Sequence, residues 1–181
     1  MPGASWALGP RGCPPATVVR NLARMDTNRS VLTAEHVMQR NVFVLRPDTQ
    51  VLDAVELLLQ RGYSGAPVVE AGRLVGVFSE RDALTAIAAA HYEDEPPGAV
   101  AQHMRRDFDV VGASTDLYEL ASCFRENPIR RLPVVDRERR LLGIVSRGDV
   151  LKGLRQLYTK RQKNSYERLQ DHMALRHGSS H

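Results

Sequence analysis

The chain has 181 residues, of which 43% are hydrophobic and 25% charged, values typical of a globular protein with one domain or two small units around a shared core. No apolar run approaches the roughly 18 residues that a membrane span needs, and the two cysteines, Cys13 and Cys123, are too few for a disulfide scaffold. The net charge of +4 is concentrated in residues 152–181, which hold seven basic and two acidic residues, so the body of the chain is nearly neutral. These totals predict a cytoplasmic protein without a membrane span.

The first 30 residues are predicted to be a disordered N-terminal segment. Seven of the first 15 are proline or glycine, which propagate neither a helix nor a ladder of strand hydrogen bonds. No apolar core follows a basic start, which disfavours a secretory signal. Four arginines against a single acid, Asp26, leave an organelle-transit interpretation open; they are Arg11, Arg20, Arg24 and Arg29.

A repeated phrase organises the rest of the chain. "GVFSERDAL" at residues 76–84 returns as "GIVSRGDVL" at residues 143–151, with Gly, Ser and Asp at a constant spacing of 67. Upstream, Pro67 pairs with Pro133 and Met38 with Met104 at a spacing of 66, so the second copy holds one extra residue in a turn, where hairpin loops tolerate insertions. This pattern predicts two copies of one unit, over residues 31–95 and 96–158.

Each copy is predicted to fold as β-α-β-β-α, preceded by a short helical turn near residues 33–38 or 99–104. In the first copy, residues 41–47 are β-branched and aromatic and end at a proline, which indicates a strand. Apolar residues then recur at helical spacing over residues 51–59. Two strands follow around a turn at Gly72, and residues 79–90 form a second helix. One such unit buries too little surface to be stable alone, so the two copies are expected to pack sheet-to-sheet about a pseudo-two-fold axis in an α/β (α+β) fold.

The end of the chain, residues 159–181, is predicted to be a basic helical tail. A polar stretch at residues 159–165 is expected to interrupt the last helix of the second copy, and Asn164 with Glu167 resembles a capping box that begins another helix. The narrow apolar stripe of such a helix needs something to pack on, either the same chain or a second copy.

The repeated Ser-x-x-Asp allows two compatible interpretations. As a capping box, the Ser and the Asp three residues later satisfy backbone N–H groups at the start of a helix. As a binding site, the same corner offers N–H groups and the positive end of the helix dipole to an anion. A carboxylate in the first turn can also accept hydrogen bonds from the vicinal hydroxyls of a ribose, because it has about four lone-pair sites.

The paired "G-h-h-S-x-x-D" ends, preceded by "APVV" and "LPVV" strands, resemble a tandem cystathionine-β-synthase (CBS) domain pair, also called a Bateman module. The resemblance covers residues 32–157. It implies that a cleft between the two repeats binds an adenosine compound, namely AMP, ADP, ATP or S-adenosylmethionine, and that two modules form a homodimer.

The resemblance also implies roles for individual residues. Asp82 and Asp149 resemble the ribose-binding Asp, with Ser79 and Ser146 as hydroxyl partners. Residues before the Pro-Val-Val strands resemble the stretch whose backbone reads the adenine edge. They are Tyr63–Ala66 in the first copy, with Tyr63, Gly65 and Ala66 as candidates, and Ile129–Leu132 in the second, with Leu132 as the candidate. Arg130 and Arg131 stand where a basic residue often contacts phosphate, and Arg81 and Arg147 are candidate helpers. For Arg130 and Arg131, a solvated strand edge is an equally weighted alternative.

The sequence therefore predicts a non-enzymatic sensor, with a target enzyme or transporter as an open class of partner. It contains no P-loop and no G-x-S-x-G, and its scattered histidines predict no metal site. Two alternatives stay open: a ligand-free dimeric scaffold that docks a partner protein, and nucleic-acid binding through the basic tail. The tail has no aromatic residues beyond Tyr158 and Tyr166, which disfavours nucleic acid as a partner.

Overall fold

The structure is a computed structural model that describes residues 32–177, with side chains described for residues 32–166. The predicted disordered segment, residues 1–30, lies outside the described residues. The first half contains α2 (Ala34–Val37), α3 (Val51–Arg61), β1 (Gly65–Glu70), β2 (Arg73–Ser79) and α4 (Glu80–Glu93). The second half contains α5 (Val100–His103), β3 (Val111–Gly112), α6 (Leu117–Glu126), β4 (Arg131–Val135), β5 (Leu141–Ser146) and α7 (Arg147–His177). The predicted α+β fold with two repeats is confirmed.

Local sequence explains where the helices begin and end. Helix α3 buries the one face formed by Val51, Ala54 and Leu58, and it ends at Gly62, whose left-handed φ of 65° favours glycine. Helix α6 begins at Asp116, whose carboxylate accepts hydrogen bonds from two backbone N–H groups of the first turn at 2.8 Å.

The strands form two small sheets. β1 and β2 pair as an antiparallel hairpin, and β3, β4 and β5 form a three-stranded sheet in that order. The strand predicted at residues 41–47 is wrong in its extent, because only Leu45 pairs, in parallel, with Val68. The chain just before this segment pairs with the other repeat, because Gln39 pairs with Ile144. The chain must therefore cross from one repeat to the other before Leu45 can pair with β1.

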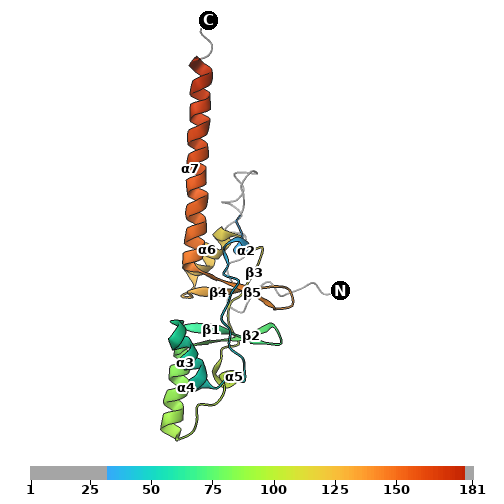
Figure 1. Ribbon diagram of the computed structural model, residues 1–181, viewed down its shortest axis with the longest axis vertical. Helices are drawn as coiled ribbons and strands as arrows, with labels where there is room; N and C mark the ends of the chain where they lie inside the picture. Colours follow the sequence, from blue (N-terminus) through green and yellow to red (C-terminus); the bar gives the residue numbers. More distant parts are fainter. Residues whose placement is uncertain (1–31, 178–181) are drawn as a thin grey trace.

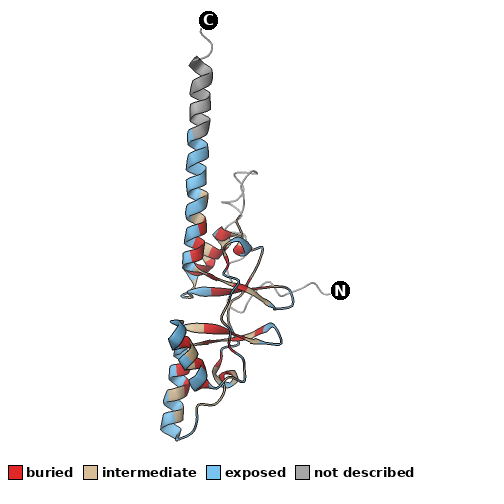
Figure 2. Cartoon of the chain, in the orientation of Figure 1, coloured by how far each residue is buried: buried red, intermediate tan, exposed pale blue. Residues whose placement is uncertain are grey.

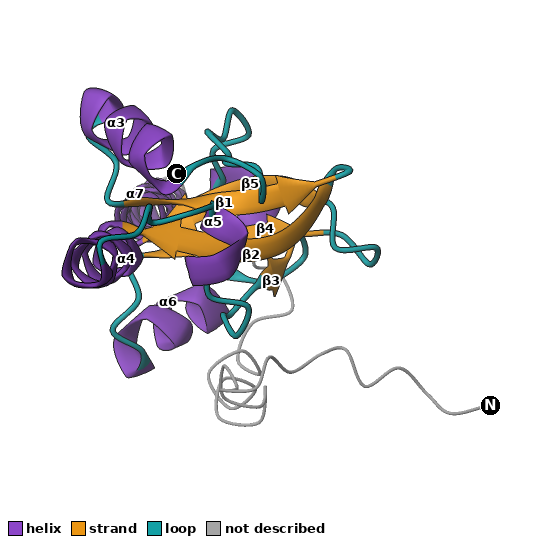
Figure 3. Ribbon diagram, turned by 90° about the horizontal axis from the view of Figure 1, so that it is seen from below, coloured by secondary structure: helices purple, strands orange, loops and turns teal. Residues whose placement is uncertain are grey.

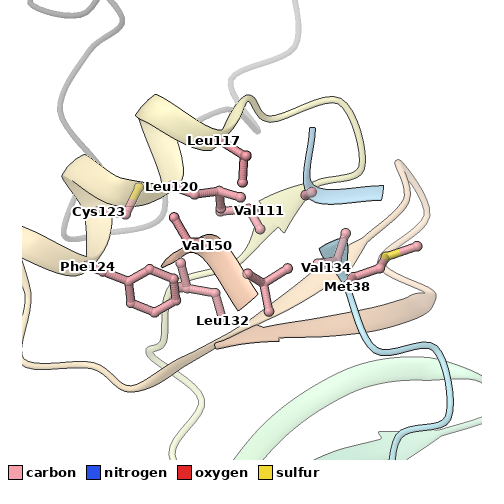
Figure 4. Packing of buried hydrophobic residues seen from close by; sticks show 11 residues of the cluster. Met38, Val111, Leu117, Leu120, Cys123, Phe124, Leu132, Val134 and Val150 are labelled. Carbon is pink, nitrogen blue, oxygen red and sulfur yellow. The ribbon is translucent and has the colours of Figure 1, made fainter. Parts of the chain in front are cut away.

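Two hydrophobic cores form, and each contains a short segment from the other half of the chain. Ala34 and Met38, at the beginning of the first copy, are buried in the core built on α6, β4 and β5 (Figure 4). Val100 and Met104, at the beginning of the second copy, are buried in the core built on α3, β1 and β2. The predicted division at residues 95 and 96 stays a prediction for the chain, but the packing makes each half depend on the other.

The two sheets face each other at the centre of the molecule, with helices on the outer sides (Figures 1 and 3). Helices α3 and α4 cover one end, and α6 and the first turns of α7 cover the opposite end. This arrangement agrees with the predicted sheet-to-sheet packing, and it places β2 and β5, which lead into α4 and α7, on either side of the centre.

Helix α7 runs from Arg147 to His177 without a break, so the predicted interruption at residues 159–165 is wrong. The stretch consists mostly of Lys, Arg and Gln, which have good helix propensity, and it contains neither Gly nor Pro. The described side chains beyond Tyr158 are exposed as the helix extends away from the body (Figure 2). Among the residues that the structure describes, no helix has both the length and the apolar character to cross a membrane.

Two short segments, Met38–Gln39 and Met104–Arg105, each cross onto the sheet of the other half and are called the crossing segments below. The repeated glycines of the two copies lie where these crossing segments approach the sheets closely. A Cβ on Gly143 would meet the backbone oxygen of Gln39 at 2.8 Å and the Met38 sulfur at 2.8 Å. At the corresponding Gly76, a Cβ would meet the sulfur of Met104 at 2.5 Å and the backbone oxygen of Arg105 at 3.2 Å. Glycine is needed at these positions for space, not for backbone conformation.

Replacing Gly143 with alanine should therefore destabilise the fold. We expect Gly143→Ala to lower the free energy of unfolding by about 1–3 kcal/mol, because the backbone of Gln39 must move away. Gly112→Ala is the matched control, since its Cβ would meet nothing nearer than Thr115 Oγ1 at 4.0 Å. Urea unfolding of both variants checks the difference, and equal midpoints would contradict this account of the close approach.

Candidate functional site

Each repeat contains a corner at which a strand passes directly into a helix. Strand β2 ends at Ser79 and α4 begins at Glu80, whereas β5 ends at Ser146 and α7 begins at Arg147. The acid three residues after each serine turns back toward the strand end. Asp82 Oδ2 accepts hydrogen bonds from the backbone N–H of Ser79 at 2.9 Å and from its hydroxyl at 2.6 Å. Asp149 Oδ2 makes the same two bonds with Ser146, at 2.9 and 2.6 Å.

The capping interpretation of the two acids is therefore correct, but it accounts for only one oxygen of each carboxylate. The other oxygen, Oδ1, faces a side chain from the crossing segment of the other half. For Asp149 that neighbour is Gln39, with Nε2 at 3.5 Å from Oδ1, and for Asp82 it is Arg105, with Nε at 3.6 Å. Both acids are largely buried: Asp149 is 8% exposed, and the side chain of Asp82 is 11% exposed.

The Asp149 corner opens into a cavity of about 280 Å³ between the two repeats. This volume is near the lower end of the range for small-molecule pockets, roughly 300–1,000 Å³. The cavity walls come from three places. The first is the crossing segment at Gln39 with the residues that follow it to Phe43, the second is β1 with the preceding Tyr63, and the third is the β4–β5 sheet with the start of α7. The lining residues are Gln39, Asn41, Val42, Phe43, Tyr63, Gly65, Pro67, Arg131, Ile144, Ser146 and Asp149.

Aromatic rings and guanidinium groups meet at one side of this cavity. The rings of Phe43 and Tyr63 lie 6.0 Å apart between centroids, at an angle of 33°. The Arg131 guanidinium lies over the Tyr63 ring, 5.5 Å from its centroid, and Arg61 lies 4.7 Å from the centroid of Phe43. The cations hold the ring faces in place by cation–π attraction, and Arg131 also brings a positive charge to the cavity wall.

These groups can bind a ligand that has three different parts. The carboxylate of Asp149 can accept hydrogen bonds from hydroxyl groups, the two rings offer a surface for a flat apolar group, and Arg131 can pair with an anion. Within residues 32–166 no three His, Cys, Asp or Glu side chains gather in a way that could hold a metal ion.

The predicted site residues are distributed over both corners and the surface. Those that line the cavity are Tyr63, Gly65, Arg131, Ser146 and Asp149. Ser79 and Asp82 lie at the other corner. The side chains of Ala66 and Leu132 are buried in the two cores, where only their backbone could reach a ligand. Arg81, Arg130 and Arg147 are exposed, and Arg147 donates a hydrogen bond to the backbone oxygen of Asn127 at 3.2 Å.

Sequence reasoning missed the wall that the crossing segment provides. Gln39 and Phe43 line the cavity, but residues 41–47 were expected to be a strand within the first repeat. One signal was present in the sequence: Met38 and Met104 pair at the repeat spacing, which marks their neighbours Gln39 and Arg105 as corresponding positions.

Comparisons with known proteins agree with this architecture. The family model described as "CBS domain" matches residues 34–89 and again residues 100–156. The uncharacterized protein MJ1225 of Methanocaldococcus jannaschii is 31% identical over 138 residues, which cover 73% of this chain and 48% of that protein. The chain therefore spans about half the length of this archaeal relative.

A plant relative matches over more of its own length. The chloroplastic CBS domain-containing protein CBSX2 of Arabidopsis thaliana is 30% identical over 170 residues, which cover 79% of this chain and 71% of the relative. The crystal structure of CBSX2 in complex with AMP superimposes with a TM-score of 0.62 at 34% identity, and the match covers 70% of this chain and 98% of that chain. With one match in each half, together extending over more than half of its residues, the chain belongs to the CBS domain family.

Proposed function

We propose that this chain is a non-enzymatic regulatory module that binds an adenosine nucleotide in the cavity at Asp149. The observation that carries the proposal is the carboxylate of Asp149, which lines a cavity with an aromatic wall. One of its oxygens is held by its own helix start, and the other faces Gln39, which lines the same cavity. The complex of the relative CBSX2 with AMP supports an adenosine ligand for a cleft of this kind.

Each part of a nucleoside monophosphate has a matching group in the cavity. The ribose hydroxyls donate to Asp149 Oδ1, the adenine lies against Phe43 and Tyr63, and the phosphate pairs with Arg131. AMP uses all three groups within about 280 Å³. ADP, ATP and S-adenosylmethionine are the other candidates, and their additional groups would extend out of the cavity.

Regulation follows from the fact that both halves of the chain supply the cavity walls. A ligand that contacts both halves favours the arrangement in which they fit it best, and it can shift an equilibrium only through that difference in affinity. The partner that reads the change, a target enzyme or transporter, and the cytoplasmic location stay predictions.

Removal of the ribose acceptor should abolish most of the binding. We expect Asp149→Ala to weaken AMP binding at least about tenfold, because hydrogen bonds to a charged group contribute roughly 1.5–3 kcal/mol each. Isothermal titration calorimetry with AMP measures the loss.

A matched control separates binding from folding. Asp116 caps α6 with its carboxylate but does not line the cavity. Asp116→Ala should cost about 0.5–2 kcal/mol of stability, as the lost cap at Asp149 does, yet leave AMP affinity unchanged. Wild-type protein that binds neither AMP, ATP nor S-adenosylmethionine at millimolar concentration would favour the ligand-free scaffold instead.

Arg131 should determine the preference for a phosphorylated ligand. We expect Arg131→Gln to weaken AMP binding about tenfold, because a charge-assisted contact with the phosphate is lost, and to change adenosine binding less than twofold. Arg130→Gln is the control, since Arg130 is also exposed and adjacent but does not line the cavity. Equal losses for AMP and adenosine would show that Arg131 acts on the ring of Tyr63 and not on the phosphate.

Exposed leucines support the proposal that two copies form a dimer. Leu84 on α4 and Leu151 on α7 occupy corresponding positions of the two repeats and are 72% and 66% exposed. A second copy would cover both at once through a two-fold axis, the commonest symmetry of oligomers.

Charges at these two positions should dissociate the dimer. We expect the double variant Leu84→Glu, Leu151→Glu to be monomeric by size-exclusion chromatography with light scattering, because the charges would be buried unpaired at the interface. Tyr92→Glu is the control on the same helix, at a side chain that is 91% exposed. A wild-type protein that is itself monomeric would rule the proposal out.

A further inference from the structure

Gln39 and Arg105 are the same structural position in the two halves of the chain. Each follows a buried methionine and exchanges two backbone hydrogen bonds with the sheet of the other half. Gln39 pairs with Ile144 at 2.9 and 3.0 Å, and Arg105 pairs with Val77 at 2.9 and 3.0 Å. The backbone is therefore fixed alike in both places, and only the side chain differs.

The difference decides what faces the second oxygen of each capping acid. Asp149 Oδ1 has the amide of Gln39 at 3.5 Å, at the outer limit of a hydrogen bond. Asp82 Oδ1 has the Nε of Arg105 at 3.6 Å, in an ion pair with a carboxylate that is 11% exposed. One acid thus faces a neutral group and the other a cation.

A ribose would have to displace a different side chain at each of the two acids. At Asp149, incoming hydroxyls replace a weak neutral donor, and the amide can rotate to donate or accept toward the ligand. At Asp82, the hydroxyls must displace a guanidinium, so the acid exchanges a charged partner for a neutral one. A guanidinium has donors but no acceptor, so it cannot take up the hydroxyl hydrogens of the ribose in place of the carboxylate.

We propose that the chain binds one adenosine ligand, at the Asp149 corner, and that Arg105 closes the Asp82 corner. This inference rests on the proposed function. The resemblance gave both Asp82 and Asp149 as candidate ribose acceptors. In this proposal Asp82 keeps only its role as a helix cap, and it becomes available to a ribose only when Arg105 is removed.

Stoichiometry tests the inference directly, with AMP as the probe in isothermal titration calorimetry of the full chain. We expect wild type to bind one AMP per chain and Asp82→Ala to keep that stoichiometry with affinity changed less than twofold. Arg105→Gln, which copies the Asp149 corner only at the carboxylate, should bind a second AMP per chain, more weakly than the first because this corner has Ile129 and Gly65 in place of Tyr63 and Arg131. The reciprocal Gln39→Arg, which copies the Asp82 corner, should weaken the single site at least tenfold. Removing the cation from a carboxylate that is 11% exposed should lower the unfolding midpoint slightly, so a cooperative unfolding transition checks that the Arg105→Gln variant is folded.

The possible failures are distinguishable. No binding by wild type overturns the proposed function and this inference with it. Two AMP per wild-type chain, or loss of a site in Asp82→Ala, overturns the inference while the proposed function stands. A folded Arg105→Gln variant that still binds one AMP also overturns it, because the corner would then be closed by something other than this side chain.

Discussion

The arrangement of the molecule depends on the crossing of two short segments, Met38–Gln39 and Met104–Arg105, each onto the sheet of the other half. The close approach over Gly143 and Gly76 leaves room for no Cβ, and the methionines are buried in the partner core. Because each core alone would be too small to be stable, this exchange makes the stability of each core depend on the other half. It also fixes which side chains face the two helix corners, so the same contacts that stabilise the fold also form the site.

At each corner one oxygen of a carboxylate caps a helix, which leaves the other oxygen to face a different group. Oδ2 of Asp149 is held by both the hydroxyl and the backbone of Ser146, so the side chain has little freedom left. Its Oδ1 is consequently fixed in position before any ligand arrives, which would reduce the entropy lost in the proposed binding. The capping box and the proposed ribose acceptor are therefore compatible with one geometry, and evidence for the first does not count against the second.

The repeated Ser and Asp made the corners predictable from sequence, because their roles are local: a cap and an acid in the first turn. The wall of the cavity was not predictable in the same way. Phe43 and Gln39 line it only because their segment crosses to the other half, and no local pattern carries that information. The continuity of α7 shows the opposite error, since a polar sequence was taken for a break although its Lys, Arg and Gln residues have good helix propensity.

The duplicated halves have diverged in a consistent direction. Tyr63, Arg131 and Gln39 all line the cavity at Asp149, and at the repeat spacing their counterparts are Ile129, Gly65 and Arg105. The counterparts offer no ring to stack on, no cation on the wall, and a cation at the carboxylate in place of a neutral amide. All three positions thus favour the same corner, although any single difference could be neutral. The two corners share one backbone geometry, and the side chains around them favour the proposed binding at Asp149, whereas Asp82 is held by its own ion pair.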